Sequence, residues 1–165
     1  MGVCHHLFCT GLLQHALEWY RYGLEKNDDA IVKFMMHWIA FNWLYSEYRR
    51  NSRSLESEAI KEFCKNKYEK LSRFDAFSSP AIAIFLEQPV RDILNGRVTS
   101  EGKDRYWSLV HDSGLEQLTS LILTIYHVRC NLFHGSKSLK IDRDVELVRA
   151  SSIILEGYLR EVLKV

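Results

Sequence analysis

The chain has 165 residues, of which 47% are hydrophobic and 12% aromatic, so its composition excludes an intrinsically disordered protein. Lys and Arg together number 22 against 21 for Asp and Glu, which gives a formal net charge of +1. This balance excludes a general attraction to nucleic acid or anionic membranes, so any such attraction must come from a local patch. The length suits one domain, residues 1–165, and the presence of only two prolines favours long helices.

Four side chains near the N-terminus have the chemistry to bind zinc: Cys4, His5, His6 and Cys9. A structural zinc site usually takes four ligands from two separated pairs, and no second Cys/His pair with short spacing follows. We therefore predict no metal site and no cofactor. We expect residues 1–9 to form a loosely ordered segment that precedes the helical domain.

We expect neither a signal peptide nor a membrane-spanning helix in this sequence. The first residues lack the basic region, apolar run and small-residue cleavage site of a signal peptide. No apolar run approaches the ~20 residues that span a bilayer. We expect a cytoplasmic protein with reduced cysteines and no membrane association.

Apolar residues recur at three- and four-residue steps through most of the chain, which predicts α-helices. The expected helices are at residues 10–27, 29–50, 55–71, 113–133 and 142–164. The predicted fold class is therefore all-α, a single-domain bundle of about five main helices.

The second predicted helix, residues 29–50, is apolar almost all round, which is typical of a central helix. Asp28 or Asp29 is the expected N-cap. Asn42 lies among these apolar residues. It is either a core amide that hydrogen-bonds a neighbouring helix or a side chain that points into a polar site.

The region between the third and fourth main helices has a less regular pattern. Residues 78–95 contain the apolar run AIAIFL, but a single strand would have no pairing partner. We predict instead two short helical pieces that begin near Pro80 and Pro89, because proline suits the first helical turn. Residues 95–105, NGRVTSEGKDR, are expected to form a loop.

Unusual chemistry gathers in residues 125–137, IYHVRCNLFHGSK, where the fourth main helix ends. At about 100° per residue, Arg129 lies on the apolar stripe of that helix, whereas His127, Asn131 and His134 share the opposite side. A guanidinium on an apolar stripe needs partners, since an unpaired buried charge is costly. A carboxylate, the carbonyl groups at a helix C-terminus or a bound anion could each be the partner of this guanidinium.

Two interpretations fit this segment. In the first, the positive charges of Arg129 and His134 interact favourably with the dipole at the helix C-terminus, which stabilises the helix by ~0.3–1 kcal/mol per charge. Asn131 is then solvated. In the second, the segment performs phosphodiester chemistry without a metal. His134 gives or takes a proton near neutral pH, Arg129 holds a phosphate, and Asn131 orients the scissile group or the imidazole. The candidates for substrate binding are Asn42, His127 and Lys137.

A single straight helix does not complete this candidate catalytic site. Arg129 and His134 are five residues apart, which places them ~140° from each other around an ideal helix. They converge only if the helix ends or bends at residues 133–135, or if a second subunit completes the site.

Three segments together resemble the HEPN (higher eukaryote and prokaryote nucleotide-binding) family. The sequence VRCNLFHG, residues 128–135, resembles the Arg-x4–6-His signature of that family. The sequence FNWLYSEY, residues 41–48, resembles the aromatic-rich second helix of bacterial HEPN proteins, and DVELVRASSIIL, residues 144–155, resembles the final helix. The resemblance spans roughly residues 28–165.

The resemblance implies an all-α bundle that forms a symmetric homodimer, with Arg129 and His134 as the motif residues. In catalytic members, both subunits' Arg and His line one cleft and cleave RNA without a metal. Many of these are toxins of toxin–antitoxin pairs or phage-defence effectors, so an antitoxin protein is an implied partner. Other members bind nucleotides or proteins without cleaving RNA, and for these we expect Arg129 to bind an internal carboxylate. The family often has a polar residue directly after the Arg, where this chain has Cys130, followed by Asn131.

Overall fold

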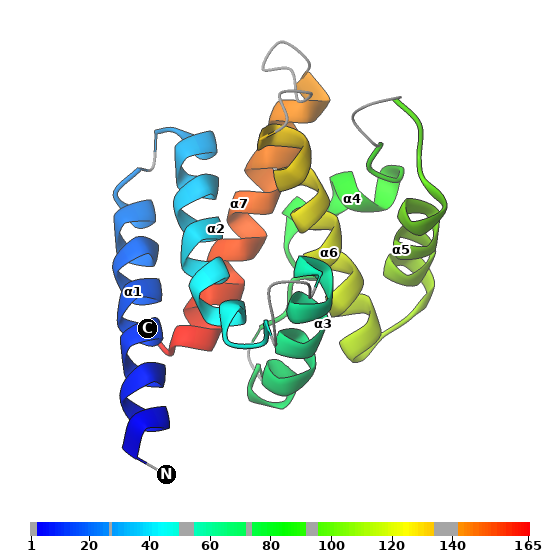
Figure 1. The fold of residues 1–165 in the computed structure, drawn as a ribbon. Helices are drawn as coiled ribbons and strands as arrows, with labels where there is room; N and C mark the ends of the chain where they lie inside the picture. Colours follow the sequence, from blue (N-terminus) through cyan, green and yellow to red (C-terminus); the bar gives the residue numbers. More distant parts are fainter. Residues whose placement is uncertain (1–2, 27, 50–54, 72–73, 92–95, 134–141) are drawn as a thin grey trace.

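The chain folds into a bundle of α-helices (Figure 1). The computed structural model describes residues 3–26, 28–49, 55–71, 74–91, 96–133 and 142–165, with side chains from residue 11 onward. The α-helices in these ranges are α1 (Val3–Leu24), α2 (Ala30–Ser46), α3 (Glu56–Lys67), α4 (Ala83–Glu87), α5 (Ser100–His111), α6 (Gly114–Phe133) and α7 (Asp142–Leu163). Two 3-10 turns are also present, η1 (Tyr68–Lys70) and η2 (Pro80–Ile82), and no strand occurs in the described ranges. The all-α prediction is confirmed.

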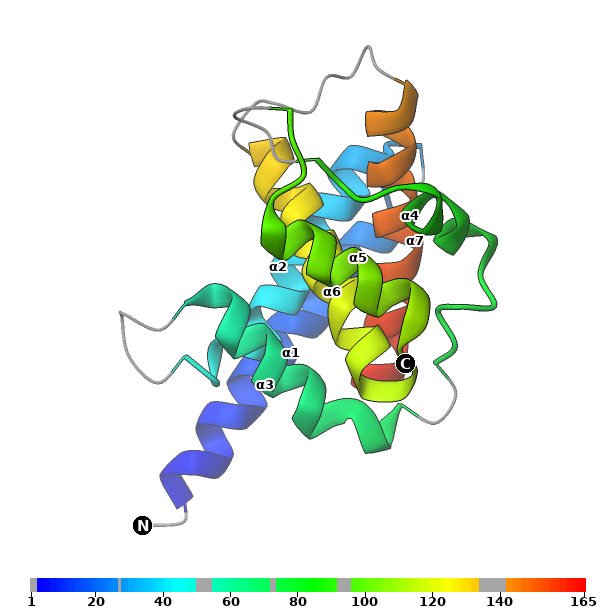
Figure 2. The same ribbon diagram turned by 90° about the vertical axis from the view of Figure 1, so that its right-hand side faces the viewer.

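Helix α6 runs through the middle of the bundle and is covered on several sides. Helices α1, α2 and α7 lie side by side in Figure 1, and α6 contacts α7 on this side. Helices α3 and α5 pack on α6 from other directions, and Figure 2 shows α5 lying over it. Buried α6 residues therefore point in several directions rather than along a single stripe. In the described part of the chain, none of the helices combines the length and apolar character needed to cross a membrane.

An aromatic cluster around the buried Phe41 joins α2 to α3 and α7. The ring centroid of Phe41 lies 5.3 Å from that of Trp38 and 4.9 Å from that of Tyr45, both on α2. It lies 5.5 Å from that of Phe63 on α3 and 5.8 Å from that of Tyr158 on α7. These edge-on contacts are the favoured geometry for aromatic pairs. They bear out the prediction that the second helix is buried on several sides.

The start of α2 also follows the sequence prediction. Asp29 is the N-cap, and its Oδ1 accepts hydrogen bonds from the backbone nitrogens of Ile31 and Val32, each at 3.0 Å. These bonds satisfy two of the amide groups that a helix leaves unpaired at its first turn. Asp29 therefore fixes where α2 begins and how its apolar faces are oriented.

Helix α5 replaces much of the loop predicted at residues 95–105. Oγ1 of Thr99 accepts a hydrogen bond from the backbone nitrogen of Gly102 at 3.0 Å and so caps the first turn. The hydroxyl of Tyr106 donates to the carbonyl of Leu86 at 2.9 Å, which ties α5 to α4. The loop prediction is wrong because the polar residues here form the exposed side of a helix stabilised by its cap and by packing.

Two further boundaries differ from the prediction. The chain is helical from Pro80 to Glu87, as η2 followed by α4, but it is not helical from Pro89 to Arg91. The second proline-initiated piece is therefore wrong over these residues, and residues 92–95 lie outside the described part. Helix α1 begins at Val3 rather than near Thr10.

Close packing of α1 against α2 depends on a glycine and a buried histidine. A Cβ atom placed on Gly23 would lie 2.6 Å from Cδ2 of His37, so no larger residue fits without movement. The fully buried His37 ring stacks on Tyr20, with 5.3 Å between centroids. Burial lowers the pKa of His37 from 6.5 to about 4, with Glu156 opposing and Lys33 adding to this shift.

This buried histidine predicts acid sensitivity. Between pH 6.5 and about pH 4, the unfolded chain binds a proton at His37 that the folded chain excludes. The free energy of unfolding should therefore decrease by on the order of 3 kcal/mol as the pH falls through this window. Urea denaturation of the wild type at a series of pH values measures the effect. His37→Leu should lose this part of the slope and His15→Leu, at an exposed histidine, should keep it; equal slopes in both would contradict the prediction.

Candidate functional site

Arg129 lies near the C-terminal end of α6, where it has one carboxylate partner and two aromatic partners. Its Nη1 is 3.7 Å from Oε2 of Glu56 on α3. Its Cζ lies 4.9 Å from the ring centroid of Phe133 and 5.7 Å from that of Trp38, which are distances typical of cation–π contacts. The side chain remains 26% exposed. The expectation that this guanidinium needs partners is confirmed, and the charged partner is a carboxylate.

Glu56 occupies the first turn of α3 and connects Arg129 to α2. One of its oxygens accepts a short hydrogen bond from the hydroxyl of Tyr45. The other lies 4.0 Å from Nη2 of Arg49 and 3.7 Å from Nη1 of Arg129. The helix dipole favours a negative charge at this end of α3. We refer to Tyr45, Arg49, Glu56 and Arg129 as the Glu56 cluster.

The Glu56 cluster carries a net positive charge. Two guanidinium groups, from Arg49 and Arg129, share the single negative charge of Glu56, which leaves one positive charge in excess. Arg129 approaches the carboxylate through Nη1 only, and this is not the paired, two-bond geometry of the strongest Arg–carboxylate contacts. The cluster therefore retains the capacity to attract an anion at the exposed part of Arg129.

Two tyrosines, Tyr45 in the cluster and Tyr126 near it, stay protonated at neutral pH. Burial, together with the hydrogen bond to Glu56, raises the pKa of Tyr45 well above its ordinary value. Burial also raises the pKa of Tyr126, with a further contribution from Cys130. Tyr126 stacks on Trp38, with 5.9 Å between ring centroids. Neither phenol has the chemistry of a general base near pH 7.

Asn131 lies on another face of α6, away from the Glu56 cluster. The side chain is buried, and its Nδ2 donates a hydrogen bond to the carbonyl of Arg91 at 2.9 Å. The expectation that Asn131 is solvated is wrong, because the segment ending at Arg91 packs over this side of the helix. This contact holds that segment in place and leaves the amide nitrogen engaged within the fold.

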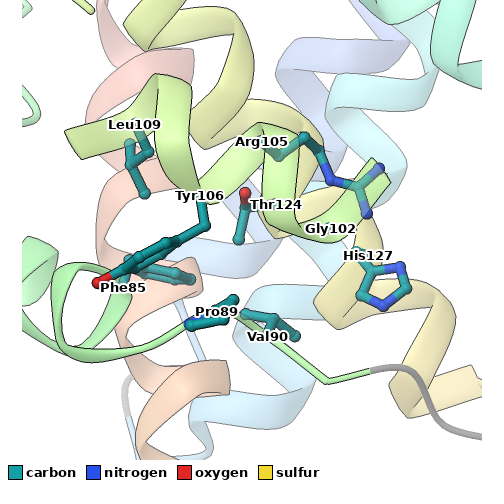
Figure 3. A pocket seen from close by; sticks show the side chains of 9 residues that line it. All are labelled: Phe85, Pro89, Val90, Gly102, Arg105, Tyr106, Leu109, Thr124 and His127. Carbon is teal, nitrogen blue, oxygen red and sulfur yellow. The ribbon is translucent and has the colours of Figure 1, made fainter. Parts of the chain in front are cut away.

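His127 faces α5 rather than α2 and α3. It lines a small cavity together with residues of α4, of the segment that follows α4, of α5 and of α6, namely Phe85, Pro89, Val90, Gly102, Arg105, Tyr106, Leu109 and Thr124 (Figure 3). Figure 3 shows Arg105 extending toward His127 from α5. The cavity has a volume of about 10 Å³, which is enough for roughly one water molecule. It is too small for a nucleotide. His127 lies against α5, whereas Arg129 contacts Trp38 of α2 and Glu56 of α3, so the structure does not bring the two side chains into one site.

Asn42 is exposed on α2, so the interpretation as a core amide is wrong. At about 100° per residue, Asn42 lies ~40° from Trp38 around the axis of α2. Trp38 contacts the guanidinium of Arg129. The second interpretation, in which Asn42 points toward a polar site, stays a prediction that is compatible with this position.

Several residues singled out in the sequence lie outside the described part of the chain. These are His134, Lys137 and the side chains of Cys4, His5, His6 and Cys9. Among the residues whose side chains are described, no group of three or more His, Cys, Asp or Glu is arranged to hold a metal ion.

The sequence patterns did not indicate Glu56 or Tyr45 as site residues. The sequence pattern predicts that Glu56 is one of several acids on the solvated face of a charged helix, and that Tyr45 is an aromatic residue of the core. The available signal was indirect: Arg129 on an apolar stripe required an anion, and Glu56 is an acid in the first turn of a neighbouring helix.

No family model, curated protein or solved structure matches the chain. The resemblance to the HEPN family therefore stays a prediction.

The two asparagines predict contrasting effects on stability. Asn131→Ala leaves the carbonyl of Arg91 without its partner, so the free energy of unfolding should fall by about 1–3 kcal/mol. Asn42→Ala, at an exposed position, should change it by less than about 0.5 kcal/mol. Urea denaturation midpoints measure both changes, and equal effects at the two positions would show that the contact with Arg91 contributes nothing.

Proposed function

We propose that this chain is a HEPN-like homodimeric endoribonuclease that cleaves RNA without a metal ion. The observation that supports it is the Glu56 cluster, which presents a partly exposed guanidinium and one net positive charge at the end of α6. Guanidinium groups suit phosphate because they combine a permanent charge with several directed donors. His134 follows one residue after the end of α6.

In this mechanism each residue has one task. Arg129 binds the scissile phosphate and stabilises the negative charge that builds up on its oxygens in the transition state. Glu56 orients Arg129 through Nη1, and the part of the Arg129 side chain that stays exposed is assigned to the phosphate. Attack by the ribose 2′-hydroxyl on phosphorus requires loss of one proton and delivery of one proton to the leaving 5′-oxygen. His134 is assigned this proton transfer, because imidazole titrates near neutral pH.

A second copy of the chain belongs to the same proposal. Residues 129 and 134 are ~140° apart on an ideal helix, so one straight helix does not direct both side chains at one phosphate. In a symmetric dimer, Arg129 of one subunit and His134 of the other can meet in a shared cleft. An antitoxin protein as partner, a role as toxin or phage-defence component and a cytoplasmic location are further parts of this proposal.

A second candidate function is a non-catalytic HEPN-like module that binds a nucleotide or a protein. One specific observation favours it: Arg129 contacts the internal carboxylate of Glu56, as this function predicts. In this case the contact with Glu56 only holds Arg129 within the fold, and the exposed part of the side chain contributes only to binding.

Cleavage assays of motif variants distinguish the two candidates. The purified wild type should cut RNA in the presence of EDTA and leave 2′,3′-cyclic phosphate ends. Arg129→Ala and His134→Ala should each lower the rate by about 10²–10³-fold, because each removes one contribution to the transition state. Arg21→Ala, at an exposed arginine on α1, is the matched control and should cut at the wild-type rate.

The same variants show which proposal fails. Dimer formation, measured by sedimentation, should persist in all of them. Cleavage at the wild-type rate by the Arg129→Ala, His134→Ala double variant would refute the endoribonuclease. A wild type that binds mononucleotides through Arg129 but never cuts RNA would favour the non-catalytic module.

Replacement of Glu56 tests its orienting task. Glu56→Gln keeps an acceptor for the Tyr45 hydroxyl but removes the charge that holds Arg129. We expect kcat to fall by about tenfold to a hundredfold, because Arg129 loses its fixed position, while KM does not rise. Glu58→Gln, at an exposed acid in the same turn, should leave both constants unchanged. A raised KM with unchanged kcat would argue against an orienting task.

A further inference from the structure

Phe133 is an exposed aromatic residue that directly contacts the Arg129 guanidinium. It is the last residue of α6, and its side chain is 52% exposed. The Cζ atom of Arg129 lies 4.9 Å from the centroid of its ring. A half-exposed Phe forfeits part of the stabilisation that full burial would bring, although single exposed apolar residues are common. Phe133 differs from other exposed apolar residues because it contacts Arg129 of the Glu56 cluster.

The other aromatic side chain that contacts this guanidinium is not available to a ligand. Trp38 is buried, and its ring stacks on Tyr126 and meets Phe41 edge-on. Phe133 has no such enclosure in the described part of the chain, so part of its ring surface faces solvent. Trp38 therefore contacts Arg129 from the core, whereas Phe133 contacts it at the surface, where a ligand can reach the ring.

An exposed ring beside a partly exposed guanidinium matches the chemistry of a nucleotide. Proteins that bind single-stranded nucleic acid stack bases on aromatic rings and hold the neighbouring phosphates with cationic groups. A base within a duplex is already stacked on both sides and offers no free face. The pair therefore suits an unpaired base rather than a base-paired one.

We propose that Phe133 is the base-stacking residue of this site, so that an unpaired RNA base stacks on its exposed ring while Arg129 binds an adjacent phosphate. The inference rests on the proposed function in taking RNA as the ligand. It requires binding alone, and cleavage is not part of it. Phe133 thereby selects single-stranded over duplex RNA at this end of α6.

Binding of two matched probes tests the proposal. The first probe is a short single-stranded oligoribonucleotide, and the second is an abasic phosphodiester of the same length and charge. At fixed salt, the wild type should bind the first about tenfold or more tightly than the second. Phe133→Leu keeps an apolar side chain over Arg129 but lacks the ring, and it should bind both probes equally. Phe133→Trp should retain the preference.

Controls separate stacking from general effects. Trp107, 60% exposed on α5, is a matched exposed aromatic residue outside the site, and Trp107→Ala should keep the preference for the base-containing probe. A preserved preference in Phe133→Leu would overturn the proposal. It would also be overturned if duplex RNA bound as tightly as the single strand. A dimer that dissociates in Phe133→Leu, with the preference intact, would show that a second copy covers the ring instead.

The outcome is independent of whether the chain is an enzyme. Suppose that the wild type prefers the base-containing probe in a Phe133-dependent way but leaves RNA uncut. This result supports the stacking role and refutes the proposed endoribonuclease activity. A wild type that cuts RNA with no change in Phe133→Leu overturns the stacking role and leaves the proposed function in place.

Discussion

The contacts of the buried Phe41 ring determine where the candidate site forms. Phe41 packs edge-on against Phe63 of α3 and Tyr158 of α7, so three helices are held at one point of the core. The same cluster orients its α2 neighbours Trp38 and Tyr45. Trp38 contacts the Arg129 guanidinium, and Tyr45 donates to Glu56, the acid that pairs with Arg129. The site thus inherits its geometry from aromatic packing rather than from the motif segment alone.

The position of Arg129 is a compromise between burial and charge. An unpaired guanidinium in an apolar environment would be strongly destabilising, and the fold resolves this with Glu56 and with two aromatic rings. Because Arg49 shares the same carboxylate, the neutralisation is incomplete. An arginine held in this way is both fixed in position and still cationic, which suits a group that binds phosphate. The same geometry also suits a module that binds phosphate without cleaving RNA.

Helical periodicity located the candidate residues around α6 but did not reveal which elements cover each face. The angle between Arg129 and Asn131 followed from residue spacing, and the structure places them on different sides of the helix as expected. Which side chains are buried and which are exposed was predicted less well. Asn131 is buried under the segment ending at Arg91, and Asn42 is exposed although apolar residues surround it in the sequence. Spacing defines directions on one helix, whereas burial depends on neighbours that are distant in the chain.

The sequence by itself determined the all-α class, the Asp29 cap, the long helices and the need of Arg129 for a partner, because periodicity, capping chemistry and charge act locally. Only the tertiary structure decided that this partner is Glu56, that α5 forms where a polar loop was expected, and that His127 and Arg129 face different helices. Each of these depends on contacts between segments far apart in sequence. Their free energy comes from packing and desolvation, which no local pattern records.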